Sequence, residues 1–166
     1  HAGQWHIADA IVWKSIRKFR AGPGGGNADK RNVAALLLMA REKGFDVVAF
    51  TRDSDGRAET VEAIRSALTE AAEGASVAFV GGCAEPCIEG WILGALGQTR
   101  SEKGSSGAAK SRLTEQFGSK SVSAYVDVLS SAELGTAPAF QHVAGDATGL
   151  LAWLRTAADV LGRSPN

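Results

Sequence analysis

Two short apolar runs separated by a helical pattern place the tightest constraint on the fold of this chain. The runs are "DVVAF" (46–50) and "SVAFVGG" (76–82), and residues 58–73 between them have the apolar spacing of an amphipathic helix. Continuous apolar runs rich in β-branched residues are typical of strands that are buried on both faces of a parallel sheet. We therefore predict an α/β layer sandwich with a parallel sheet.

Further helical patterns surround these strands. They are predicted over residues 6–20, 30–43, 86–96, 108–117, 121–134 and 147–162. We expect Asp29 to cap the second of these helices and Gly44 to end it. Pro86 is expected in the first turn of the third, where its missing N–H costs nothing.

The length of 166 residues and the lack of a visible linker predict a single domain over residues 1–166. Two strands make a poor sheet, so at least one more strand is expected. This additional strand is expected either upstream of His1 or near "FQHVAG" (140–145). The first position is considered because the sequence begins with histidine and not with methionine.

Composition narrows the function classes. Lys plus Arg and Asp plus Glu number 18 each, so the net charge is zero, whereas dedicated nucleic-acid binders are more often basic. A local basic patch remains compatible with this balance. The two cysteines, Cys83 and Cys87, predict reduced thiols in a cytoplasmic protein rather than a disulfide framework. No membrane span or signal peptide is predicted.

Paired acids follow the first apolar run, in "FTRDSDGR" (50–57). Asp53 and Asp55 are one residue apart, and like charges this close repel unless something positive lies between them. Ligands gather at the carboxyl ends of parallel strands, and Mg²⁺ takes one or two carboxylates while it keeps several waters. The alternative is a polar turn, because Asp, Ser and Gly are the residues that turns prefer.

A third acid follows the second apolar run. Glu89 lies in the first turns of the apolar helix "PCIEGWILGAL" (86–96), where a buried carboxylate needs a partner. The alternative is that Glu89 only stabilises the positive N-terminus of this helix. Glu85 is the other acid of this segment and is expected to be exposed. We predict that Asp53, Asp55 and Glu89 lie at one rim of the sheet, flanked by the mobile loops "AGPGGGN" (21–27) and "RSEKGSSG" (100–107).

Several motifs, taken in order, resemble the DUF4276 family of TOPRIM-like proteins. They are "VVAFTRDSDG", "AEPCIEGWILGAL", "AAKSRLTEQFG" and "SSAELGTAPAFQHVAGDATGLLAWL", within residues 30–160. The positions that carry the family pattern are Asp53 and Asp55, Glu89 with Trp91, Lys110, and Pro138 with Phe140.

The resemblance implies a three-layer sandwich, with a mostly parallel central sheet flanked by helices, and Mg²⁺- or Mn²⁺-dependent catalysis. Asp53, Asp55 and Glu89 would bind the metal, and Lys110 would stabilise the charge on a scissile phosphate. TOPRIM domains usually also have a glutamate after their first strand. The segment "HAGQWHIAD" (1–9) lacks it, so the glutamate lies upstream or is replaced, with His6 or Asp9 as alternative ligands.

Basic residues supply a candidate nucleic-acid surface. Lys14, Arg17, Lys18 and Arg20 lie within "WKSIRKFR" (13–20), interleaved with Trp13 and Phe19. Such a face can bind a phosphate backbone, or it can be an ordinary solvated helix face. For Lys110 the corresponding alternative is a surface lysine.

Three functions are compatible with these features. The first is a metal-dependent phosphodiesterase or nuclease of TOPRIM type, in phage defence or DNA repair. The second is a non-catalytic TOPRIM-like binding or sensor subunit of a larger assembly, favoured by the neutral charge and the missing glutamate. The third is a haloacid-dehalogenase-like phosphatase, because "DSDG" resembles that family's signature, although about 50 residues precede it here.

Overall fold

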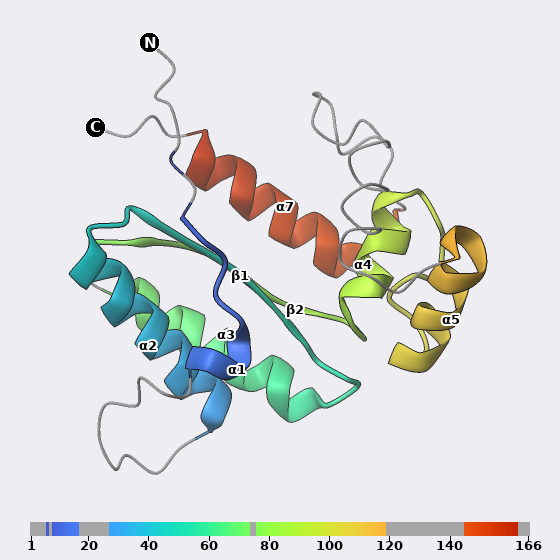
Figure 1. Ribbon diagram of the computed structural model, residues 1–166, viewed down its shortest axis with the longest axis horizontal. Helices are drawn as coiled ribbons and strands as arrows, with labels where there is room; N and C mark the ends of the chain where they lie inside the picture. Colours follow the sequence, from blue (N-terminus) through green and yellow to red (C-terminus); the bar gives the residue numbers. More distant parts are fainter. Residues whose placement is uncertain (1–5, 7, 17–26, 74–75, 119–144, 163–166) are drawn as a thin grey trace. The chain divides into compact units, whose positions relative to one another are not determined.

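The computed structural model describes residues 6, 8–16, 27–73, 76–118 and 145–162. Strands alternate with helices along the chain, so the protein is α/β, as the sequence predicts (Figure 1). The described elements are α1 (Trp13–Ile16), α2 (Ala28–Lys43), β1 (Val47–Asp53), α3 (Ala58–Ala72), β2 (Ala78–Ala84), α4 (Ile88–Ala95), α5 (Ser106–Phe117) and α7 (Thr148–Leu161). Among these elements, no helix is both long and apolar enough to cross a membrane.

The two strands form a small parallel sheet with the order β1-β2. At its start the N–H of Ala78 donates to the carbonyl of Asp46 (2.8 Å), and past its end the N–H of Ser54 donates to the carbonyl of Ala84 (3.0 Å). Because both strands run in the same direction, their carboxyl ends lie at one edge of the sheet. The further strand expected near 140–145 falls almost entirely outside the described residues.

The chain packs as two compact units. Unit 1 comprises His1–Phe50, Glu59–Gly81 and Thr156–Asn166, and unit 2 comprises Thr51–Ala58 and Gly82–Arg155. The boundary crosses both strands and the helix α7, so no linker in the sequence marks it. Every residue of the acidic rim belongs to unit 2.

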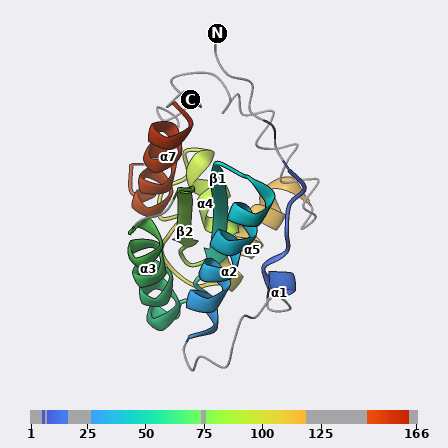
Figure 2. The same ribbon diagram turned by 90° about the vertical axis from the view of Figure 1, so that its left-hand side faces the viewer.

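Helices α2 and α3 lie side by side in unit 1 (Figure 2), where the ammonium of Lys30 on α2 pairs with the carboxylate of Glu70 on α3 at 2.8 Å. Helix α2 begins at an Asn27 cap, whose side chain accepts a hydrogen bond from the N–H of Asp29 at 2.8 Å. It ends at Gly44 in the left-handed conformation (φ 69°), as predicted. Asp29 itself is not the cap. Its carboxylate is buried and accepts from the indole Nε1 of Trp13 at 3.0 Å.

Helix α4 is the centre of unit 2. All seven residues after Ile88 are buried, Glu89 included. One part of the core joins Trp91 and Ala95 to Leu150 of α7, and another joins Leu93 to Leu113 of α5. Trp91 also packs against Trp153, with ring centroids 6.1 Å apart and ring planes tilted by 55°. The rim residues that follow β1 and β2 are therefore built on a well-packed element.

Further predicted features differ in the structure. The helix predicted over 6–20 is reduced to the four residues of α1, because residues 8–12 are not helical and 17–20 lie outside the described part. Ile11 and Val12 are 42% and 68% exposed, so the apolar face that would have stabilised a longer helix is left largely uncovered by the described residues. Strand β1 is also less buried than predicted, with Phe50 as its one buried residue, because among the described residues it pairs with a single neighbour.

The position of Pro86 also differs from the prediction. It precedes Cys87, the N-cap residue of α4, instead of occupying the first turn. Its carbonyl accepts from the N–H of Asp55 at 2.9 Å, which ties this segment to the turn after β1.

The loop before α5 is more firmly held than its glycine- and serine-rich composition predicts. Arg112 donates to the carbonyls of Thr99 (3.2 Å) and Arg100 (3.3 Å). The carboxylate of Glu102 accepts from the N–H groups of Gly149 (2.9 Å) and Leu150 (2.8 Å) in the first turn of α7. The other predicted loop, 21–27, lies outside the described residues except for Asn27.

Replacing Glu102 by alanine is expected to destabilise the protein by about 1–2 kcal/mol, because two N–H groups of α7 lose a charged acceptor. Urea denaturation measures this loss. Glu115→Ala, which removes an exposed carboxylate from α5, is the matched control and should change stability little. Equal effects of the two substitutions would show that Glu102 does not cap α7.

Candidate active site

The turn after β1 is fastened to the segment that follows β2. Ser54 is 1% exposed, and its hydroxyl donates to the carbonyl of Pro86 and accepts from the N–H of Gly56, both at 3.3 Å. The N–H of Arg57 donates to the carbonyl of Ser54 at 3.0 Å and closes the turn. Asp55 and Gly56 have φ angles of 50° and 73°, in the left-handed region that Asp tolerates and Gly favours. The backbone that carries the paired acids is therefore rigidly placed.

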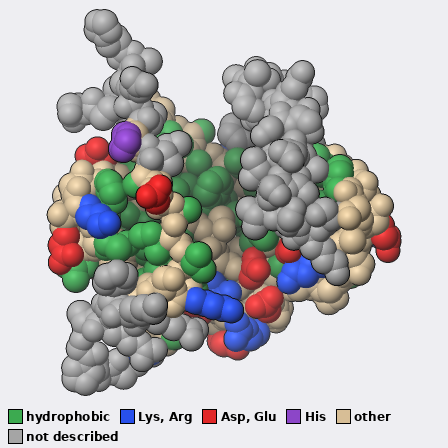
Figure 3. Space-filling view, in the orientation of Figure 1, with side chains coloured by type: hydrophobic (Ala, Val, Ile, Leu, Met, Phe, Trp, Pro, Cys, Tyr) green, Lys and Arg blue, Asp and Glu red, His purple; other side chains and the backbone are tan. Residues whose placement is uncertain are grey.

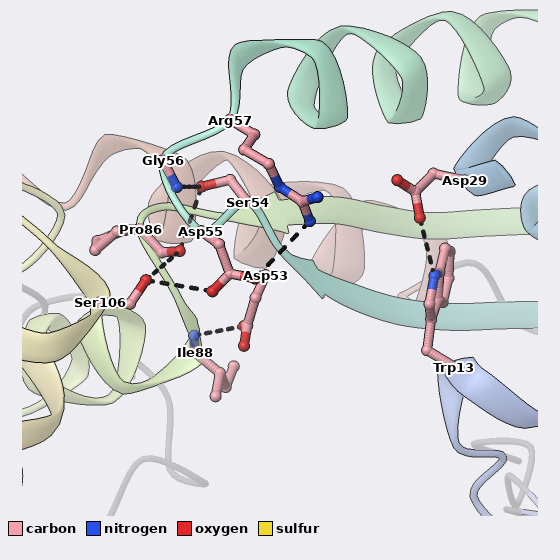
Figure 4. A network of polar contacts seen from close by, with 10 residues as sticks. All are labelled: Trp13, Asp29, Asp53, Ser54, Asp55, Gly56, Arg57, Pro86, Ile88 and Ser106. Atoms are coloured by element: carbon pink, nitrogen blue, oxygen red, sulfur yellow. Dashed lines mark hydrogen bonds and ion pairs between the residues drawn. The ribbon is translucent and has the colours of Figure 1, made fainter. Parts of the chain in front are cut away.

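Asp53 is the last residue of β1, and it points to the start of α4 (Figure 4). One carboxylate oxygen, Oδ1, accepts from the N–H of Ile88, the first residue of α4, at 2.8 Å. The positive end of this helix therefore compensates part of the charge of Asp53. Burial nevertheless raises the pKa of Asp53. The bond from Ile88 opposes this rise, and the charges of Glu89 and Asp55 reinforce it.

Asp55 lies beside Asp53 at the end of the strand (Figure 4). Its Oδ1 accepts from the hydroxyl of Ser106 at 3.4 Å, and its Oδ2 lies 3.9 Å from a guanidinium nitrogen of Arg57. The side chains of Asp55 and Arg57 are 47% and 50% exposed, so this ion pair is largely solvated.

Glu89 lies in the first turn of α4 and is 8% exposed. It is near enough to Asp53 for its charge to raise the pKa of that carboxyl. It also adjoins Cys87, which is fully buried. Burial raises the pKa of the Cys87 thiol, and Glu89 adds to the rise. Cys83 and Cys87 do not form a disulfide with each other, and Glu85, the other acid of the segment, is exposed as expected.

Lys110 completes the cluster. It is half-buried on α5, and its charge lowers the pKa of Asp53, which places it near that carboxylate. The structure thus brings Asp53, Asp55, Glu89 and Lys110 together in unit 2. Their catalytic and metal-binding roles stay predictions.

The carboxylates of the cluster could bind a cation such as Mg²⁺, which needs only one or two protein ligands. Among the described residues, no group of three or more His, Cys, Asp and Glu side chains is arranged to hold a metal ion. Asp53 and Asp55 still offer two hard oxygen ligands at the end of one strand, and Mg²⁺ needs no more when waters fill its remaining positions. Burial and, to a lesser extent, the charges of Glu89 and Asp55 raise the pKa of Asp53, and a bound cation would favour its ionised form.

The remaining predicted residues lie either in unit 1 or outside the described residues. His6 and Asp9 are exposed and lie in unit 1, as does Lys14, which is exposed on the short helix α1. Arg17, Lys18 and Arg20 lie outside the described residues, and so do Pro138 and Phe140. On the face shown in Figure 3, the described Lys and Arg side chains lie among Asp and Glu side chains rather than in a stripe of one sign.

Three residues of the site were missed by sequence reasoning: Ser54, Arg57 and Ser106. The hydroxyl of Ser54 donates to the carbonyl of Pro86, and the hydroxyl of Ser106 contacts both Pro86 and Asp55. In each of these contacts the two residues are at least 20 positions apart in the sequence, so no local pattern reveals them. Arg57 could have been found, because it ends the same "DSDGR" stretch that contains both aspartates.

No protein-family model matches the chain, and no curated protein or solved structure is significantly similar to it.

Proposed function

We propose that this protein is a TOPRIM-like phosphodiesterase that hydrolyses nucleic acid with Mg²⁺ or Mn²⁺. The observation that carries the proposal is the gathering of Asp53, Asp55 and Glu89 around one strand end, with Lys110 beside them. Acids and a lysine in one place are what phosphoryl chemistry needs, since the acids hold a cation and the lysine faces the phosphate.

Each residue has a distinct task in this proposal. Asp53 and Asp55 hold the cation, which when bound neutralises the phosphate and lowers the pKa of its water. Glu89, buried in the first turn of α4, adds negative charge near Asp53 that favours a divalent ion over a monovalent one. Lys110 binds an oxygen of the scissile phosphate and stabilises the charge that develops there. The hydrogen bond from Ile88 holds Asp53 in one orientation.

A second candidate is a non-catalytic TOPRIM-like subunit of a defence or repair assembly. One observation favours it. The two aspartates already have partners within the chain, the N–H of Ile88 and the guanidinium of Arg57. A site whose charges are compensated internally can be stable without any metal.

The test is cleavage of labelled single-stranded DNA, duplex DNA and RNA with Mg²⁺ or Mn²⁺, with chelator as the control. We expect cleavage of at least one substrate that requires the metal and is lost in Lys110→Ala, since that substitution removes the charge facing the phosphate. A phosphomonoester is included as a fourth substrate. Its hydrolysis, with none of the nucleic acids, would favour the haloacid-dehalogenase-like phosphatase. Metal binding without any hydrolysis would favour the non-catalytic subunit.

A further inference from the structure

Arg57 is held at its backbone but only loosely at its guanidinium. Its N–H is fixed to the carbonyl of Ser54 at 3.0 Å, so the start of the side chain has one position. The guanidinium reaches Asp55 Oδ2 only at 3.9 Å, too far for a hydrogen bond, and the side chain is half exposed. Apart from Asp55 and Arg57 themselves, none of the described residues lies within 4 Å of where a Cβ on Gly56 would be, so the turn is open beside Gly56.

Structural charged groups elsewhere in unit 2 are bound quite differently. Arg112 donates to three acceptors in residues 98–100, at 3.0–3.3 Å. Glu102 accepts two bonds from α7, at 2.8 and 2.9 Å. Compared with these, the pair formed by Arg57 and Asp55 adds little to the fold, because exposed ion pairs are weak. Its place beside an acid of the proposed metal site suggests a functional use.

We propose that Arg57 is an exchangeable counter-ion: it pairs with Asp55 while the site lacks a cation, and it binds the substrate's phosphate once a cation takes Asp55. The inference rests on the proposed function. A guanidinium suits both partners, because its planar set of donors matches carboxylate and phosphate alike. The fixed backbone and the open turn let the guanidinium change partner without any rearrangement of the fold.

The proposal predicts opposite effects of one substitution on two ligands. Arg57→Gln removes a cation that competes with the metal, so Mg²⁺ should bind about two- to fivefold more tightly. Inorganic phosphate, added at saturating Mg²⁺, should bind at least about fivefold more weakly, because a charged hydrogen-bond donor is lost. Thermal unfolding during each titration, at low ionic strength, measures both affinities without any need for turnover.

Two further variants serve as controls. Arg57→Lys keeps the charge and should bind Mg²⁺ as the wild type does, while phosphate binding recovers only in part. Arg65→Gln removes an exposed arginine that pairs with Glu62 at 2.9 Å in unit 1, and it should change neither affinity.

The outcomes separate this inference from the proposed function. If Asp53→Asn abolishes Mg²⁺ binding while Arg57→Gln leaves both affinities unchanged, the role of Arg57 is refuted and the metal site stands. If Arg57→Gln binds Mg²⁺ more tightly but its affinity for phosphate is unchanged, only the phosphate-binding part of the inference fails. If Mg²⁺ binds Arg57→Gln and not the wild type, Arg57 is a counter-ion and the Mg²⁺-dependent function is wrong. If neither protein binds Mg²⁺, both proposals are overturned.

Discussion

Asp53→Asn is expected to abolish the stabilisation that Mg²⁺ or Mn²⁺ gives to the wild-type protein. A ligand that binds only the folded state adds RT ln(1 + [L]/Kd), about 2.7 kcal/mol at a hundredfold excess over Kd. Asparagine keeps an oxygen to accept the N–H of Ile88, so the start of α4 is preserved. It removes the negative charge that the cation requires. Thermal unfolding with and without millimolar metal measures the difference.

The same substitution should leave the metal-free protein no less stable at neutral pH. Burial, followed by the charges of Glu89 and Asp55, raises the pKa of Asp53 above its ordinary value of 3.8. The folded state therefore holds this proton more tightly than the unfolded state does. Stability falls as pH rises from 3.8 through the raised pKa, and the full cost of the ionised carboxylate is present above that range. Asparagine removes this cost, so the pH dependence of unfolding should flatten in the acidic range.

Asp9→Asn is the matched control. It makes the same chemical change at an exposed aspartate of unit 1, and it also tests Asp9 as an alternative ligand. Its response to Mg²⁺ should equal that of the wild type. If the wild type and Asp53→Asn respond identically to metal, the paired aspartates are only a turn, held by the N–H of Ile88 and by Arg57.

Much of the fold could be predicted because local and tertiary preferences agree. Helix α3 has a regular apolar face and Gly44 ends α2 in the left-handed conformation, so periodicity and capping were sufficient there. The meeting of Asp53 with Glu89 also followed from the sequence, since both follow strands that prove to be parallel and adjacent.

The failures occur where a distant contact decides the outcome. The helix predicted over 6–20 has a suitable pattern, but the described residues leave Ile11 and Val12 exposed. Pro86 satisfies the rule for a first helical turn, yet its carbonyl is used by Asp55 and by the hydroxyls of Ser54 and Ser106. Such contacts depend on how the rest of the chain folds, which no local window of sequence contains.

Gly90→Ala is expected to destabilise the protein by about 2 kcal/mol, although alanine is the better helix former by about 1 kcal/mol. A Cβ at Gly90 would lie 2.7 Å from the carbonyl oxygen of Ser101, 3.2 Å from Pro86 Cδ and 3.3 Å from the carbonyl oxygen of Glu85. Two of these atoms are backbone and cannot rotate away. The overlap therefore outweighs the gain in helix propensity, and α4 must shift from the loop that contains Ser101. Urea denaturation measures the loss.

Gly107→Ala is the matched control, because it makes the same change in another helix of unit 2. There the new Cβ would meet only the hydroxyl of Ser105, at an ordinary 3.7 Å. With no overlap to oppose it, the higher propensity of alanine should stabilise the protein, by up to about 1 kcal/mol. The two substitutions should therefore act in opposite directions. If Gly90→Ala also stabilises the protein, the carbonyl of Ser101 does not approach α4 closely. The start of α4, which positions Glu89 and Ile88 beside Asp53, would then be less tightly enclosed than the structure has it.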